Sequence, residues 1–90
     1  MLPSISSYGH YRSNNYGVNT LRVDIGDLTV WYSYQTPVAF RVLGNELVIR
    51  YNSWGQTTGK HLNWIDDDHS KRVDAETFQR LWNEQTGCLV

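Results

Sequence analysis

Hydrophobic and polar residues alternate along four short runs between residues 20 and 51. A period of two is typical of strands that are buried on one face. The Gly26-Asp27 and Gly44-Asn45 pairs separate neighbouring runs, and such residues tolerate the backbone angles of tight hairpin turns. The apolar positions of the four runs are Leu21, Val23 and Ile25; Leu28, Val30, Tyr32 and Tyr34; Val38, Phe40 and Val42; and Leu47, Ile49 and Tyr51. The pattern predicts a four-stranded antiparallel β-meander over residues 20–51.

The two predicted hairpins each have a register that keeps the apolar side chains together. In the first hairpin, Ile25 lies opposite Leu28 and Arg22 opposite Trp31. In the second hairpin, Val42 lies opposite Leu47, Phe40 opposite Ile49 and Val38 opposite Tyr51, while Arg41 opposes Val48 and Ala39 opposes Arg50. A slip of one residue would move every side chain to the other face, so the register fixes which face is buried. The meander is expected to have one apolar face and one polar face.

Residues 74–86 carry the pattern of an amphipathic helix. Asp74 is a favourable N-cap, and Phe78, Leu81 and Trp82 fall on one stripe at helical spacing. This helix is expected to cover the apolar face of the meander. The predicted fold class is therefore α+β: a four-stranded antiparallel β-meander with one C-terminal α-helix packed on its apolar face. Residues 1–19 are expected to form an irregular N-terminal arm that lies partly on the core, and residues 52–73 a long loop.

Composition narrows the classes of protein that fit this fold. Ninety residues suit a single domain over 1–90, and four Trp, six Tyr and two Phe supply a dense core for so short a chain. The formal net charge is −1, whereas nucleic-acid-binding domains are normally basic. No apolar run approaches the roughly 18 residues of a membrane span, and the first residues do not resemble a signal peptide. A cytoplasmic protein without a membrane partner is expected.

The segment 52–69, NSWGQTTGKHLNWIDDDH, combines residue types that suggest several kinds of chemistry. A phosphate-binding loop needs four residues between its glycines and Ser or Thr after the Lys. Here three residues separate Gly55 from Gly59, and His61 follows Lys60. A turn-rich connection between sheet and helix is therefore the preferred interpretation, and no cofactor is expected.

The same segment holds side chains that commonly ligate metals, namely His61, Asp66, Asp67, Asp68 and His69. The alternating Asp-x-Asp spacing of a calcium loop is absent, so a solvated acidic turn is favoured and no metal ligand is assigned. A small metal-dependent hydrolase that uses His61 with Asp66–Asp68 is kept as an alternative function.

The outer face of the predicted meander is richer in binding chemistry. Arg22, Trp31, Arg41 and Arg50 are all expected on it, and arginine presents a fork of donors to anions. Such a face would bind acidic protein surfaces, or single-stranded nucleic acid through stacking and phosphate contacts. The alternative is an ordinary solvated sheet face in which the N-terminal arm covers Trp31.

Three stretches resemble one family of small proteins with no established activity, encoded mainly by bacteriophages and prophages. They are YGVNTLRVDIGDLTVWYSYQTPVAFRV, TTGKHLNWID and FQRLW, within residues 8–84, and TTGKHLN is the most distinctive. The resemblance implies a phage-encoded protein that acts in the bacterial cytoplasm.

The leading functional expectation is a non-enzymatic binding protein that modulates or inhibits a host or defence protein, such as a component of CRISPR–Cas. Exposed Trp and Arg side chains are the usual contacts at interaction hot spots. The candidate contacts are Trp54, Lys60, His61 and Asn63 in the loop, and Arg22, Trp31, Arg41 and Arg50 on the sheet. Single-stranded nucleic acid is the alternative partner, and pairing of two copies through an edge strand is also expected to be accessible.

Overall fold

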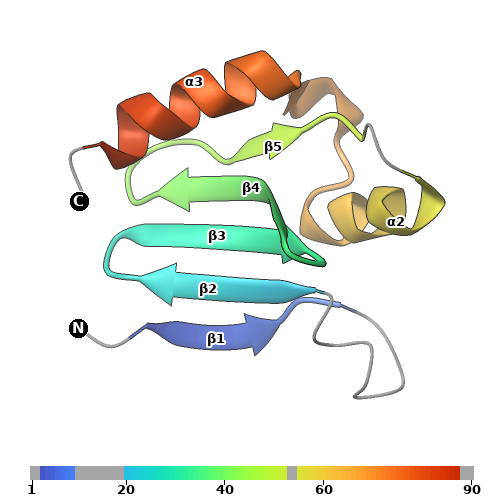
Figure 1. The fold of residues 1–90 in the computed structure, drawn as a ribbon, viewed down its shortest axis with the longest axis horizontal. Helices are drawn as coiled ribbons and strands as arrows, with labels where there is room; N and C mark the ends of the chain where they lie inside the picture. The colour runs from blue at the N-terminus through green and yellow to red at the C-terminus, as the bar shows by residue number, and fades with distance from the viewer. Residues whose placement is uncertain (1–2, 10–19, 53–54, 88–90) are drawn as a thin grey trace.

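The computed structural model describes residues 3–9, 20–52 and 55–87, and it has an α+β fold (Figure 1). The sheet has six strands in the order β1-β2-β3-β4-β5-β6. The first five strands pair antiparallel, and β6 pairs parallel with β5. The elements are β1 (Ser4–Ser7), β2 (Leu21–Ile25), β3 (Leu28–Ser33), β4 (Thr36–Val42), β5 (Val48–Arg50), α2 (Gln56–Ile65), the 3₁₀ turn η1 (His69–Lys71), β6 (Arg72–Val73) and α3 (Ala75–Thr86).

The first hairpin and the C-terminal helix confirm the predictions made for them. Ile25 pairs with Leu28 and Arg22 with Trp31, and Gly26 takes the positive φ of 58° that the turn requires. Helix α3 begins after Asp74, whose carboxylate accepts a 2.7 Å hydrogen bond from the Thr77 amide. The alternation of residue types is sufficient here because a tight turn sets the register.

The predicted register of the second hairpin is wrong by one residue. Phe40 pairs with Val48 rather than Ile49, and Ile49 pairs with Ala39. Residues 43–47 all lie between β4 and β5, so the connection is longer than a two-residue turn and Leu47 does not enter the strand. The shift moves Ile49 to the other face, and Tyr51, which was expected inside, is 59% exposed.

A bulge in β4 also contradicts the one-sided sheet. Trp31 pairs with Ala39 but Tyr32 pairs with Pro37, so the pairing skips Val38. Val38 then packs with Trp31 and Ala39 instead of with Phe40. A bulge places one extra residue on one strand and reverses the alternation beyond it. The sheet consequently buries side chains on both of its faces.

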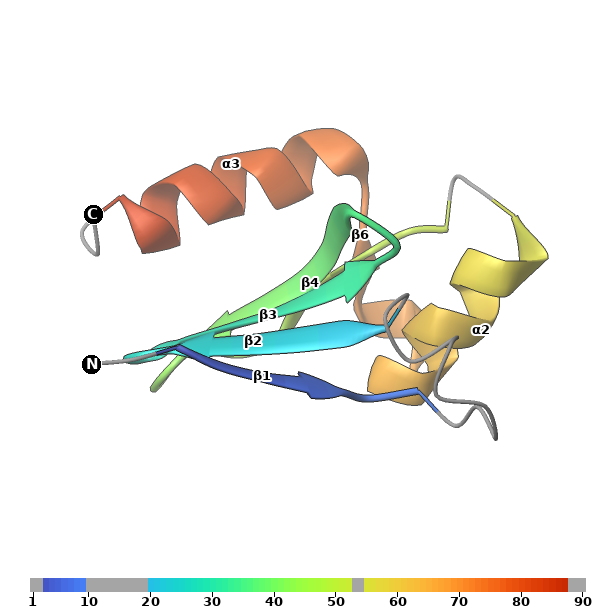
Figure 2. The same cartoon turned by 60° about the horizontal axis from the view of Figure 1, so that its bottom comes forward.

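Each face of the sheet has its own core, and the two helices lie at different faces (Figure 2). On one face, α3 packs against β4 and β5. On the other face, α2 lies near the turn between β3 and β4. The α3-side core contains Val30, Phe40, Val48 and Phe78, with Leu81 and Trp82 packed against it. The α2-side core contains Trp31, Val38, Ala39, Ile49 and Leu62, with Tyr8, Leu47 and Ile65 packed against it.

Helix α2, η1 and β6 replace most of the loop predicted over residues 52–73. Leu62 and Ile65 face the sheet at helical spacing, but the surrounding Thr, Gly and His residues hide this short apolar stripe in the sequence. Gly59 lies inside the helix, where glycine costs about 1 kcal/mol relative to alanine. A Cβ at Gly59 would come 2.9 Å from Asn52 Nδ2, so a close approach of the preceding segment explains the glycine.

The prediction of an irregular arm over residues 1–19 is wrong for Ser4–Ser7, which form β1, and residues 1–2 and 10–19 lie outside the described part. Ser4–Ser7 holds a single apolar residue, so its sequence carries no alternation, and the strand is formed by backbone pairing with β2. Tyr8 lies on the core as expected, and its hydroxyl donates a 2.7 Å hydrogen bond to the Tyr32 carbonyl. Within the described residues, no helix is long and apolar enough to cross a membrane.

Candidate interaction surface

Three of the four predicted sheet residues lie together on the α2 side of the sheet. Arg22, Trp31 and Arg41 form a group that we call the arginine face. The prediction that Arg50 lies on the same face is wrong. Arg50 pairs with Val73, and its guanidinium carbon lies 5.9 Å from the centroid of the Phe78 ring on the α3 side. The one-residue shift in the second hairpin is the cause of this change of face.

Trp31 is the centre of the arginine face. The Arg22 and Arg41 guanidinium carbons lie 5.4 Å and 5.6 Å from its ring centroid, and Trp31 is only 7% exposed. Guanidinium groups at this distance are attracted to the negative face of the ring. Trp31 therefore acts as a platform that orients the two arginines, and is not itself an exposed contact.

The two arginines of this face differ in their partners. Arg22 Nε forms a 3.1 Å ion pair with Asp24, which also accepts a 2.6 Å hydrogen bond from the Thr29 hydroxyl. The Thr29 hydrogen bond, followed by those from Arg22, lowers the pKa of Asp24. Arg41 is exposed and has no ion-pair partner in the described part of the chain. Arg41 therefore carries the charge that is available to a ligand.

Beside Arg41 lies a groove of about 390 Å³. Leu47 contributes an apolar wall that packs on the Trp31 core. The groove is lined by Arg41, Asn45, Glu46, Leu47 and Lys71. The sequence did not reveal this groove, because Leu47 was expected inside a strand and Lys71 inside a long loop.

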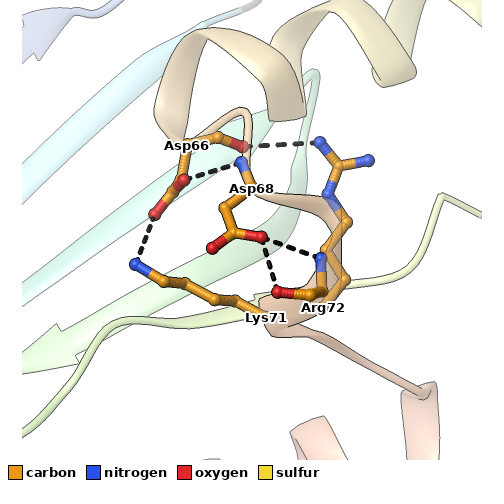
Figure 3. A network of polar contacts seen from close by, with 5 residues as sticks. Asp66, Asp68, Lys71 and Arg72 are labelled. Atoms are coloured by element: carbon orange, nitrogen blue, oxygen red, sulfur yellow. Dashed lines mark hydrogen bonds and ion pairs between the residues drawn. The ribbon is translucent and has the colours of Figure 1, made fainter.

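A polar network surrounds Lys71, which lines the groove (Figure 3). Lys71 Nζ contacts the Asp66 carboxylate at 3.5 Å, and Asp66 also accepts a 2.9 Å hydrogen bond from the Asp68 amide. Asp68 accepts hydrogen bonds of 2.6 Å from the Ser70 hydroxyl and 3.0 Å from the Ser70 amide, and these bonds, the hydroxyl first, lower the pKa of Asp68. The acidic run thus fixes the path of η1.

The hydrolase alternative is not supported by the placement of its proposed residues. His61 lies in a buried cluster with Ser33, whereas Asp66 and Asp68 stabilise η1. Among the described residues, no group of three or more His, Cys, Asp or Glu side chains is arranged to hold a metal ion. Asp66 is half-buried and Asp67 and Asp68 are exposed, and the three residues connect α2 to η1.

His61 is fully buried, which contradicts its assignment as a surface contact. A 2.7 Å hydrogen bond joins its Nδ1 to Ser33 Oγ, which also lies 3.2 Å from the Thr58 hydroxyl. Its ring stacks on Trp64 with centroids 5.7 Å apart. Burial, followed by the nearby charge of Lys60, lowers the pKa of His61. A neutral imidazole that joins α2 to the end of β3 is a structural element of the fold.

The remaining predicted loop contacts have separate environments. Lys60 is exposed, and its Nζ lies 5.8 Å from the centroid of the Trp64 ring. The Asn63 side-chain oxygen accepts a 2.7 Å hydrogen bond from Arg72 and lies 3.0 Å from His69 Nε2, so Asn63 fastens α2 to β6. Trp54 lies outside the described residues. Of the three predicted contacts on α2, Lys60 is the one that presents an exposed positive charge.

Comparison with known proteins places these features in a family. One family model matches residues 4–81, from β1 into α3. The chain belongs to DUF8033, a family of unknown function. No curated protein and no solved structure matches it. The match to DUF8033 spans the arginine face, the groove and the His61 cluster, so all three lie within the region that defines the family.

Proposed function

We propose that the protein is a non-enzymatic binding protein that docks on an acidic surface of a partner protein. The contact would be made by the arginine face together with the groove beside Arg41. The observation that carries the proposal is the position of Arg41, which stacks on the buried Trp31 and lines the groove. Arginine held against an aromatic platform loses less side-chain freedom on binding than a mobile surface arginine.

The composition of the surface favours a folded protein partner over single-stranded nucleic acid. Nucleic-acid binding of this type needs an exposed aromatic ring on which bases can stack. Trp31 does not offer one, because the Arg22 and Arg41 guanidinium groups lie over its ring. Asp24 pairs with Arg22 and Glu46 lines the groove, so this surface does not carry the continuous positive charge that suits a phosphate backbone. A carboxylate on a protein surface suits a single available arginine better.

The biological setting of the proposal follows from the resemblance of the sequence to phage-encoded proteins. The partner would then be a host or defence protein in the bacterial cytoplasm, and binding would modulate or inhibit it by covering one of its surfaces. A small chain that presents one preorganised cation and a groove is suited to occupying a surface of this kind.

The proposal can be tested by capture with matched charge-reversal variants. The full chain is immobilised and exposed to bacterial lysate, and captured proteins are quantified by mass spectrometry. We expect Arg41→Glu to abolish the capture of a specific protein, and Arg80→Glu to retain it. Arg80 is a matched control because it is exposed on α3, 3.4 Å from Glu84 and away from the groove.

With the captured protein purified, a titration measures the size of the effect. Loss of an interaction hot spot weakens binding by about 30-fold or more, which corresponds to roughly 2 kcal/mol. Equal losses for Arg41→Glu and Arg80→Glu would contradict the proposed site. Capture that disappears on nuclease treatment would instead identify nucleic acid as the ligand and contradict the proposed partner class.

A further inference from the structure

Among the described residues, no strand pairs with the outer edge of β1. Strand β1 is the terminal strand in the sheet order, and all four of its residues are exposed. Ile5 is 64% exposed. Natural edge strands commonly carry Lys, Pro or a bulge that discourages pairing with another strand. Ser4–Ser7 contains none of these, and nothing in the described part of the chain blocks this edge from another strand.

The pairing with β2 determines which backbone groups point to this outer edge. The Tyr8 amide donates a 3.0 Å hydrogen bond to the Thr20 carbonyl, and Ser4 pairs with Asp24 in the same register. Alternate residues of an antiparallel strand bond to the same neighbour, so Ser4 and Ser6 also face β2. The intervening residues Ile5 and Ser7 therefore direct an amide and a carbonyl outward, and Pro3 directs a carbonyl only.

We propose that two copies of this chain pair through β1, antiparallel and centred on Ile5. Each Ile5 would exchange two hydrogen bonds with Ile5 of the second copy. Each Ser7 amide would donate to the Pro3 carbonyl of the other chain. This register gives every outward amide of β1 a partner and places the missing proline amide opposite the Ser7 carbonyl. The six-stranded sheet would continue into that of the second copy.

The side chains around β1 favour a second copy as the occupant. Ile5 and Val23 continue a row that runs through Val30 to Phe40 on the α3 side of the sheet. Helix α3 packs against Val30 and Phe40 but leaves Ile5 exposed. Self-pairing places the two Ile5 side chains directly opposite each other, so each covers apolar surface of the other.

Charge does not oppose this pairing. Strand β1 carries no charged residue, and the nearest charges on β2, Arg22 and Asp24, form an ion pair with each other. A strand of four residues buries far less than the roughly 1,200 Å² of a standard stable interface. The dimer is therefore expected to be weak and concentration-dependent.

Self-pairing has a consequence for the arginine face. The two-fold axis of an antiparallel strand pair is perpendicular to the sheet, so the arginine faces of both copies would point to the same side. Two linked contacts bind a repeated or symmetric partner more tightly than one contact does. The pairing itself does not depend on the proposed partner, and it can be tested with the purified protein alone.

Disulfide trapping tests the register. Ile5→Cys is made with Cys88→Ser, and the protein is oxidised mildly. Directly opposed residues in a hydrogen-bonded pair have Cα atoms about 5.5 Å apart, within the range that disulfides span. We expect a covalent dimer of Ile5→Cys and none of Leu43→Cys, which is 76% exposed on the turn after β4. Equal cross-linking of the two variants, or none, would overturn the proposal.

Analytical ultracentrifugation of the wild-type chain tests the backbone contacts. Ser7→Pro removes an outward amide and leaves the hydrogen bonds to β2 intact, whereas Ser7→Ala removes only the hydroxyl that lies 3.0 Å from Thr20 Oγ1. We expect the dimer fraction to rise with concentration, Ser7→Pro to weaken dimerisation about tenfold or more, and Ser7→Ala to leave it unchanged. A wild-type chain that stays monomeric at its solubility limit, or equal effects of both variants, would refute self-pairing but not the role of Arg41.

Discussion

The two faces of the sheet are buried by different means. On the α3 side, Phe40 meets the rings of Phe78 and Trp82 edge-on, with centroids 5.4 Å and 5.1 Å away. On the α2 side, Trp31 lies beneath two guanidinium groups, and His61 is held by Ser33. The first face is a conventional apolar core, whereas the second places polar and charged groups against aromatic rings. The candidate interaction surface belongs to the second face.

The largest expected effect tests the apolar face. Phe40→Ala removes a fully buried ring between β4 and α3, and such truncations cost about 3–5 kcal/mol of unfolding free energy. Ile25→Ala on the same face should cost far less, because Ile25 is 48% exposed. Chemical denaturation measures both values. Similar losses for the two variants would show that α3 does not pack on the sheet as described.

The polar cluster under α2 is expected to contribute less. Ser33→Ala removes the group that lies 2.7 Å from His61 Nδ1, and loss of a buried hydrogen-bonding partner costs about 1–3 kcal/mol. The double variant Ser33→Ala/His61→Phe should recover part of this loss, since both polar groups are then replaced. Urea denaturation of the two single variants and the double variant gives the coupling energy. Strictly additive losses would indicate that the two side chains do not interact.

The stability of the α2 side is expected to depend on pH through His61. The pKa of His61 is lower in the folded chain than its ordinary value of 6.5, so the unfolded chain binds the proton first as pH falls. The stability from neutral His61 is fully present above pH 6.5 and decreases below it. The decrease is at most about 1.4 kcal/mol per pH unit and ends at the folded pKa.

Thermal unfolding between pH 7.5 and pH 5 measures this dependence. Three carboxylates have pKa values below the ordinary 3.8, so they do not titrate between pH 7.5 and pH 5. They are Asp24, Asp68 and Asp74. His61→Gln is the control, and its melting temperature should vary less with pH than that of the wild-type chain. An unchanged pH profile in His61→Gln would assign the effect to other groups.

The contrast between the faces also explains which parts of the fold could be predicted. The α3 face was largely accessible from the sequence, because Val30, Phe40 and the stripe on α3 follow regular periods of two and 3.6 residues. The α2 face was not. The bulge at Val38 and the longer connection before β5 change the face of the sheet on which side chains lie. Neither feature alters the alternation of hydrophobic and polar residues in the sequence.

Individual residues of the candidate surface show the same limit. Arg22 opposite Trp31 was predicted correctly, because a tight Gly-Asp turn fixes that register. Arg50 was assigned to the wrong face, since its position depended on the second hairpin. His61 is buried but was expected at the surface, because a helix with Gly59 in its interior resembles a loop in the sequence. Asn63 is exposed but bonded to Arg72. Only tertiary contacts, such as those of Ser33 and Arg72, identify their roles.

The smallest expected effect on stability is the one most informative about function. Arg41→Ala removes a cation–π contact at an exposed site, worth about 0.5–1 kcal/mol, while Trp31 keeps Arg22 as a cover. Arg22→Ala should be the more destabilising of the two, because it also leaves Asp24 without its ion-pair partner. Binding should show the opposite order, with Arg41→Ala weakening capture of the partner more than Arg22→Ala. Parallel denaturation and binding measurements would separate the arginine that stabilises this face from the arginine that binds, and the same order in both would contradict that division.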